Sequence, residues 1–153
     1  MMGAALATIP AMGMAQAAEP ASAPASPGLS AALAPILAGD HRSEANRARD
    51  GWRHPSETLA FFGVAPGQRV VEIWPGAGWY SDILAPLLKD QGTYIAALPD
   101  PNGASEGMKA GIQRFKDKLA ANPGLYGTPE LTTFGPKALE AMPANSVDRI
   151  LTF

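Results

Sequence analysis

One acidic residue and two alternate glycines in residues 70–82, VVEIWPGAGWYSD, have the spacing of a ligand-binding turn. Glu72 closes an apolar run, and Gly76 and Gly78 follow where the apolar pattern changes from that of a strand to that of a helix. When a parallel strand ends in this way, a carboxylate and bare backbone lie at the carboxyl edge of the sheet, where a ligand can approach closely. The stretch therefore predicts a binding site for a nucleotide-type ligand.

The same spacing argues against the common phosphate-binding loops. The dinucleotide fingerprint G-x-G-x-x-G requires a glycine three positions after Gly78, and Ser81 occupies that position. The phosphate loop G-x-x-x-x-G-K-[ST] requires a Gly-Lys pair, and the sequence contains none. An NAD-type oxidoreductase fragment is therefore a less favoured alternative.

The elements that must position this turn follow from the apolar spacing. Runs rich in apolar residues predict strands at residues 69–73, 92–98, 131–134 and 147–153. Helical spacing and end signals predict helices at residues 29–37, 57–62, 79–89, 105–121 and 137–142. We expect Pro35 to limit the first helix, Ser56 to cap the second, Gly63 to end it in a left-handed conformation, and Pro86 to kink the third.

The alternation of apolar strands with helices predicts an α/β fold, specifically a Rossmann-like doubly wound parallel sheet. The sequence stops inside the fourth predicted strand, whereas a doubly wound sheet normally continues beyond that point. We therefore expect residues 40–153 to be the N-terminal part of such a domain, truncated after the fourth strand.

Composition limits the classes of partner. With 153 residues, of which 46% are apolar and 17% charged, the chain can bury one core. A formal net charge of −2 gives no general attraction to nucleic acid or to an anionic membrane, and no apolar run outside the leader is long enough for a membrane span. The absence of cysteine excludes disulfides, thiolate catalysis and Cys-based zinc sites.

Residues 1–39 differ from the rest and are expected to form a leader followed by an Ala/Pro-rich linker. Ala15, Gln16 and Ala17 form an A-x-A cleavage site, which predicts a signal peptide and a periplasmic or secreted protein. No Lys or Arg precedes Arg42, so the positive region of a signal peptide is missing. Either the true start lies upstream, or the segment is a disordered tail of a cytoplasmic protein.

The segment at residues 40–53, DHRSEANRARDGWR, has the alternating charges of a solvated helix face. An alternative is that its arginines close over a cofactor or an acidic substrate, namely Arg42, Arg47, Arg49 and Arg53. His41 and His54 lie 13 positions apart without a third ligand motif, so we predict no metal site. Trp79 and Tyr80 begin a predicted helix, where aromatic side chains usually pack rather than contact ligands.

The stretch E-I-W-P-G-A-G resembles the first motif of class I S-adenosylmethionine-dependent methyltransferases, in which an acidic residue is followed by three glycines at alternate positions. Glu72 matches the acidic residue, and Gly76 and Gly78 match the second and third glycines. Trp74 departs from the pattern, because it stands where the first glycine would be. The resemblance implies S-adenosyl-L-methionine as the cofactor and methyl transfer as the reaction.

In that family the glycine loop lies against the methionine part of the cofactor, and the acidic residue helps to hold its ammonium group, often through water. The family's second acidic residue, which binds the ribose hydroxyls, would fall by register on Leu98, and Asp100 is the only nearby candidate. The cofactor-binding residues that the resemblance implies are Glu72, Ile73, Trp74, Pro75, Gly76, Ala77, Gly78 and Asp100. It implies no catalytic residue, since methyl transfer depends chiefly on positioning.

A longer stretch, about residues 40–153, resembles an exported bacterial group of predicted methyltransferases. The shared features are an Arg/Asp-rich entry segment, a P-x-E-x-L-x-F-F-G helix, the P-G-x-G-W-Y motif and a fourth strand like SVDRILTF. The resemblance implies no particular methyl acceptor, and a fragment of this length can be inactive alone. Trp74 and Leu98 favour an alternative, a non-catalytic ligand-binding module on the same fold.

Overall fold

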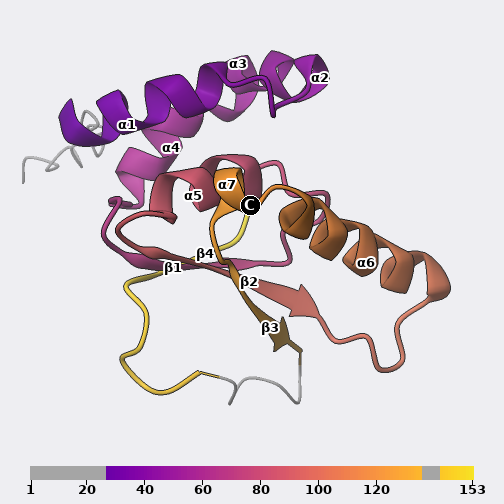
Figure 1. The fold of residues 1–153 in the computed structure, drawn as a ribbon. Helices are drawn as coiled ribbons and strands as arrows, with labels where there is room; N and C mark the ends of the chain where they lie inside the picture. Colours follow the sequence, from indigo (N-terminus) through magenta and orange to yellow (C-terminus); the bar gives the residue numbers. More distant parts are fainter. Residues whose placement is uncertain (1–26, 136–141) are drawn as a thin grey trace, which may run out of the picture.

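A computed structural model of the chain describes residues 27–135 and 142–153 and contains a four-stranded sheet (Figure 1). The strands are β1 (Arg69–Ile73), β2 (Thr93–Pro99), β3 (Glu130–Phe134) and β4 (Arg149–Leu151). Their order is β3-β2-β1-β4, and every neighbouring pair is parallel. The prediction of an α/β fold with a Rossmann-like parallel sheet is therefore confirmed.

Helices precede β1 and also lie in the connections from β1 to β2 and from β2 to β3. Between residue 27 and β1, the structure describes α1 (Pro27–Ala38), α2 (Glu44–Ala48), α3 (Asp50–Arg53) and α4 (Pro55–Phe61). The β1–β2 connection holds α5 (Ser81–Leu88), and the β2–β3 connection holds α6 (Glu106–Ala121) and α7 (Pro123–Tyr126). In Figure 1, α1, α4, α5 and α7 stack over the same face of the sheet.

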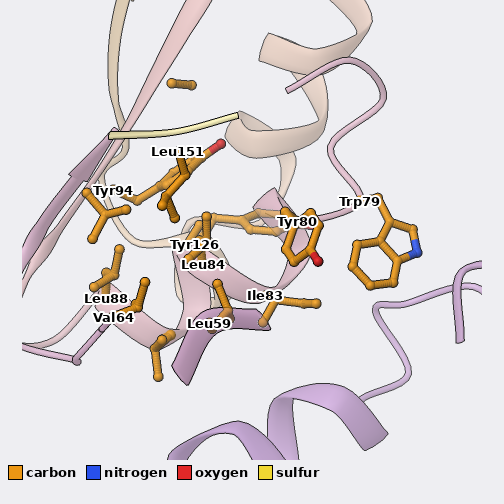
Figure 2. Close-up of a cluster of buried hydrophobic side chains, with 14 of the residues drawn as sticks. Leu59, Val64, Trp79, Tyr80, Ile83, Leu84, Leu88, Tyr94, Tyr126 and Leu151 are labelled. Atoms are coloured by element: carbon orange, nitrogen blue, oxygen red, sulfur yellow. The ribbon is translucent and has the colours of Figure 1, made fainter. Parts of the chain in front are cut away.

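The main core lies between this face of the sheet and the helices. Alternate strand residues such as Val70, Tyr94 and Ala96 point into it, because successive side chains of a strand face opposite sides. Leu33 of α1 and Leu84 of α5 are fully buried opposite them. Figure 2 shows part of this cluster, with Trp79 at one end of it, beyond Tyr80. A smaller cluster on the other face contains Val71, Ile95 and Ala97.

Two expectations about helix ends were wrong, and one was confirmed. Ser56 does not cap α4, since Pro55 fills the first helical turn and His54 is the N-cap in a left-handed conformation with φ 42°. Pro35 lies inside α1, which continues to Ala38. Gly63 has φ 65° just after α4, as predicted.

The helix predicted at residues 105–121 is confirmed as α6. Ser105 is its N-cap, and its hydroxyl accepts a hydrogen bond from the Met108 N–H. Phe115 and Leu119 are buried, whereas Met108 at the other end of the apolar stripe is 48% exposed. Helix α7 was not predicted from the sequence, and the helix predicted at residues 137–142 lies almost entirely outside the described residues.

The packed body includes α1, which lies within the range assigned to the leader and linker. Leu29 and Leu33 of this helix are buried in the main core. The predicted cleavage site at residues 15–17 falls outside the described residues. Within residues 27–135 and 142–153, no helix has the length and apolarity needed to cross a membrane.

Candidate functional site at the carboxyl edge of the sheet

Glu72 lies near the end of β1 on the helix-covered face of the sheet. Its side chain is buried, and its Oε2 accepts hydrogen bonds from the Tyr94 hydroxyl at 2.6 Å and from the Ser81 hydroxyl at 2.8 Å. Tyr94 comes from β2 and Ser81 from the first turn of α5. The carboxylate is therefore fixed by both elements that follow it in the chain.

The second oxygen of Glu72, Oε1, accepts no hydrogen bond from any described residue. The residue is only 3% exposed, yet it lines a cavity beside the glycine loop. Among the described residues, Arg42 Nε is the one fully buried side-chain nitrogen or oxygen without a hydrogen-bond partner, so Glu72 Oε1 is not sealed off and can accept a hydrogen bond from a ligand in this cavity. Glu72 is thus suited to bind a cationic or donor group inside that cavity.

Burial raises the pKa of the Glu72 carboxyl above its ordinary value, because the charged form loses its hydration. The hydrogen bonds from Tyr94 and Ser81 oppose the rise, and the negative charge of Asp82 adds to it. Burial also raises the pKa of Tyr94 well above its ordinary value, so this phenol stays protonated and can donate to Glu72. A cation bound at Oε1 would favour the ionised carboxylate.

The loop after β1 contains three residues in the left-handed region: Trp74 with φ 51°, Gly76 with φ 59° and Gly78 with φ 81°. Two of them are glycines, which adopt this region without strain. A side chain on Gly76 would meet no atom within 4 Å, so its backbone is open to the cavity. Gly76 therefore keeps bare main chain facing the space that Glu72 lines.

Unlike Gly76, Gly78 packs against α6. An added Cβ would lie 2.9 Å from the Phe115 ring and 3.2 Å from Lys118 Nζ. The Lys118 ammonium pairs with Asp82 at 2.7 Å and donates to the Ala77 and Gly78 carbonyls, each at 3.3 Å. Lys118 thus ties the glycine loop to α6, and Gly78 makes room for it.

This contrast predicts unequal costs for the same substitution. Gly78→Ala should lower the free energy of unfolding by about 3 kcal/mol, from left-handed strain plus overpacking. Gly76 also has a positive φ, but no atom lies near the position of an added Cβ. Gly76→Ala should therefore lower the free energy of unfolding by only about 1 kcal/mol, from the left-handed strain alone. Chemical denaturation of both variants measures the difference, and equal costs would show that the packing of Gly78 on α6 does not matter.

The cavity that Glu72 lines, here called the inner cavity, has a volume of about 250 Å³. Its walls are Asn46, Arg49, Arg53, Glu72, Ile73, Trp74, Pro75, Gly76, Ala77, Trp79, Tyr80 and Phe153. The Arg53 guanidinium lies over the Trp79 ring, 4.9 Å from its centroid, and neither Arg49 nor Arg53 forms an ion pair with a described residue. The inner cavity thus has a carboxylate and two guanidinium groups on its walls.

The solvated-face prediction for residues 40–53 is wrong for Arg42. This side chain is fully buried and forms two hydrogen bonds to Asp50, at 2.6 and 2.7 Å. The pair joins the start of the segment to α3, and the Trp79 indole donates to the Asn46 carbonyl at 3.0 Å. These contacts place Arg49 and Arg53 beside the glycine loop.

A larger groove of about 830 Å³, here called the outer cavity, lies at the carboxyl ends of β2 and β3. It is lined by Trp74, Pro99, Asp100, Asn102, Gly103, Ala104, Ser105, Met108, Phe134 and Gly135. Asp100 follows β2 directly, and its Oδ1 accepts a hydrogen bond from the Asn102 N–H at 2.8 Å. Leu98, at the position of the family's second acidic residue, is buried in the main core.

Seven of the eight expected cofactor-binding residues therefore line one of the two cavities, and Gly78 does not. Trp79 and Tyr80 are buried as predicted, but they also form a wall of the inner cavity. Asn46 and Phe153, which also line the inner cavity, were not predicted as site residues. The alternative that the arginines of residues 40–53 close over a cofactor or an acidic substrate was the one interpretation that pointed toward this wall, whereas their spacing favoured a solvated face.

The histidines lie outside both cavities. The His41 ring nitrogen Nε2 lies 2.9 Å from the Asp82 carbonyl oxygen, and His54 occupies the turn between α3 and α4. Among the residues that the structure describes, no group of three or more His, Asp or Glu side chains is arranged to hold a metal ion.

No protein-family model matches the sequence, and the search of curated proteins gives no match. The resemblance to class I methyltransferases therefore stays a prediction from the motif, and the geometry of the site carries the functional argument.

Proposed function

We propose that this chain binds S-adenosyl-L-methionine across the carboxyl edge of its sheet and belongs to a methyltransferase that uses it as methyl donor. The observation that carries the proposal is that Oε1 of Glu72, a buried residue, accepts no hydrogen bond from the described residues, while Glu72 lines a small cavity beside a larger one. Ligands of open parallel sheets bind at this edge.

The inner cavity suits the amino-acid end of the cofactor. Glu72 would accept a charge-assisted hydrogen bond from the ammonium group, and its negative charge also favours the nearby sulfonium. Arg49 and Arg53 lie on the same cavity and can bind the carboxylate. The charges of the walls therefore complement both charges of an α-amino acid group.

The outer cavity suits the nucleoside. Its volume lies within the usual range for small-molecule sites, and its lining combines apolar groups such as Met108 with one carboxylate, Asp100. Asp100 can accept hydrogen bonds from ribose hydroxyls, which is the role that Leu98 cannot perform. The bare backbone at Gly76 leaves room for the ligand in the adjoining inner cavity.

When bound, the cofactor supplies a methyl group on a cationic sulfur, which an acceptor attacks in line. The chain itself contributes binding and orientation through Glu72, Arg53 and Asp100. We assign no general base, since positioning alone provides much of the acceleration for such a transfer.

Calorimetric titration with S-adenosylhomocysteine tests the proposal. The parent chain should give saturable heat, whereas Gly76→Val should give none, because a branched side chain at φ 59° both strains the loop and fills the approach to Glu72. Gly67→Val is the matched control, since Gly67 lies in the turn before β1 with no atom near its Cβ position. Equal heat from all three proteins, or heat from none, would contradict cofactor binding at this loop.

A non-catalytic binding module is the second candidate, and Trp74 is the observation that favours it. Its indole lies between the two cavities, where a cofactor spanning them would pass. This candidate predicts that a ligand binds while no methyl transfer to any acceptor occurs. Transfer of radiolabelled methyl groups to small-molecule and protein acceptors distinguishes the two.

A further inference from the structure

Trp74 has a backbone conformation that its side chain disfavours. Its φ of 51° lies in the left-handed region, which is uncommon for non-glycine residues and especially so for bulky ones. The Trp74 N–H donates to the Ala97 carbonyl at 2.9 Å, so β2 holds the residue in this conformation. Strained residues of this kind concentrate at ligand sites, so the conformation of Trp74 indicates a role in ligand binding.

The side chain of Trp74 crosses the carboxyl edge of the sheet. Its indole Nε1–H donates to the Phe134 carbonyl at the end of β3, at 3.1 Å, although Trp74 itself follows β1. Because β2 lies between β1 and β3, the indole extends past the end of β2. Of the residues that the structure describes, Trp74 alone lines both the inner and the outer cavity.

The attachment of the indole is a weak one. A single hydrogen bond to Phe134 holds its polar end, and the residue is 58% exposed. One hydrogen bond between neutral groups at such a site contributes about 1 kcal/mol, so the indole can leave Phe134 at small cost. Its departure would join the two cavities into one.

We propose that Trp74 is a specificity-determining residue: its indole, bound to the Phe134 carbonyl, divides the two cavities, and a ligand that fills both binds only after the indole has moved away. The inference rests on the proposed function. A ligand that fills the outer cavity alone binds without this movement. Trp74 therefore lowers the affinity for spanning ligands and leaves that for nucleoside-only ligands unchanged.

Two variants separate the effect of the hydrogen bond on affinity from the effect of the bulk of the ring. Trp74→Phe keeps an aromatic ring but loses the donor to Phe134, and Trp74→Gly removes the divider and suits the left-handed backbone. Trp52→Phe is the matched control, because Trp52 is 85% exposed and lines neither cavity. The probes are S-adenosylhomocysteine, which spans both cavities, and methylthioadenosine, which lacks the amino-acid group.

We expect S-adenosylhomocysteine to bind about fivefold tighter to Trp74→Phe than to the parent, the factor that corresponds to one neutral hydrogen bond. Trp74→Gly should bind it about tenfold tighter, since the bulk of the ring is removed as well. The affinity for methylthioadenosine should stay within about twofold of the parent in every variant. Trp52→Phe should match the parent with both probes.

Unchanged or weaker binding of S-adenosylhomocysteine by both Trp74 variants would overturn the inference while leaving cofactor binding intact. If none of the proteins bound S-adenosylhomocysteine or methylthioadenosine, the proposed function itself would be contradicted. A readout that needs only the parent chain is the Trp74 indole N–H resonance, identified by its loss in Trp74→Phe. Its exchange with solvent should become faster on addition of S-adenosylhomocysteine, because the hydrogen bond to Phe134 is broken, and should not become faster with methylthioadenosine. Faster exchange with both probes, or with neither, would also overturn the inference.

Discussion

Glu72→Gln should strongly weaken cofactor binding and at the same time make the protein more stable at neutral pH. The amide can still accept from Tyr94 and Ser81, but it offers no negative charge to an ammonium group inside the inner cavity. Loss of one charge-assisted hydrogen bond in a buried site corresponds to about 100-fold in affinity. Calorimetry with S-adenosylhomocysteine measures this loss.

The gain in stability follows from the raised pKa of Glu72. In the unfolded chain this carboxyl ionises near its ordinary pKa of 4.5, whereas in the folded chain it ionises at higher pH. The parent therefore loses folding free energy as the pH rises from 4.5 through the folded-state pKa, and Glu72→Gln does not. Above that window the variant should unfold at a higher denaturant concentration than the parent.

Glu57→Gln is the matched control, because Glu57 is an exposed residue of α4. Glu57→Gln should leave the affinity for S-adenosylhomocysteine and the pH dependence of the protein's stability unchanged. If Glu72→Gln bound S-adenosylhomocysteine as well as the parent did, the carboxylate would have no role in binding. If it were less stable than the parent at neutral pH, the carboxylate would be a structural group.

Asp50→Asn should destabilise the protein by about 3 kcal/mol, because it leaves the Arg42 guanidinium buried without its counter-charge. Arg42 is fully buried, and Asp50 is the carboxylate that it bonds through two nitrogens. Since this pair holds α3, which follows Arg49, the variant should also bind S-adenosylhomocysteine more weakly. Urea denaturation and calorimetry measure the two effects.

Glu106→Gln provides the comparison, because Glu106 pairs with Lys109 on the surface of α6 and its side chain is 89% exposed. Exposed pairs of this kind contribute little, so the change should stay within about 0.5 kcal/mol. Equal effects of Asp50→Asn and Glu106→Gln would show that the Arg42–Asp50 pair does not fix the N-terminal segment.

The sequence predicted the elements that carry the strongest local signals. The strand at Arg69–Ile73 was located correctly because its apolar residues are buried on both faces of the sheet. The start of α6 was predicted because Ser105 supplies its own capping oxygen. Glu72 and Gly76 were placed at a cavity by the same logic, since a strand ending in a tight turn opens onto the carboxyl edge.

The features that sequence reasoning missed depend on contacts between distant residues. An alternating charge pattern cannot reveal that Arg42 stacks 5.1 Å from the centroid of the Trp79 ring and is buried there. Ser56 has good capping chemistry, but Pro55 begins the helix one residue earlier. The motif itself showed that Trp74 replaces the first glycine. It did not show that the Trp74 indole donates a hydrogen bond to Phe134, 60 residues away.

A crystal structure of the chain with S-adenosylhomocysteine tests the central claim most directly. We predict that the ligand's amino group lies within hydrogen-bonding distance of Glu72 Oε1 and its adenosine lies in the outer cavity beside Asp100. A structure with the ligand bound elsewhere, or with Oε1 facing only solvent while the ligand occupies the loop, would contradict the account.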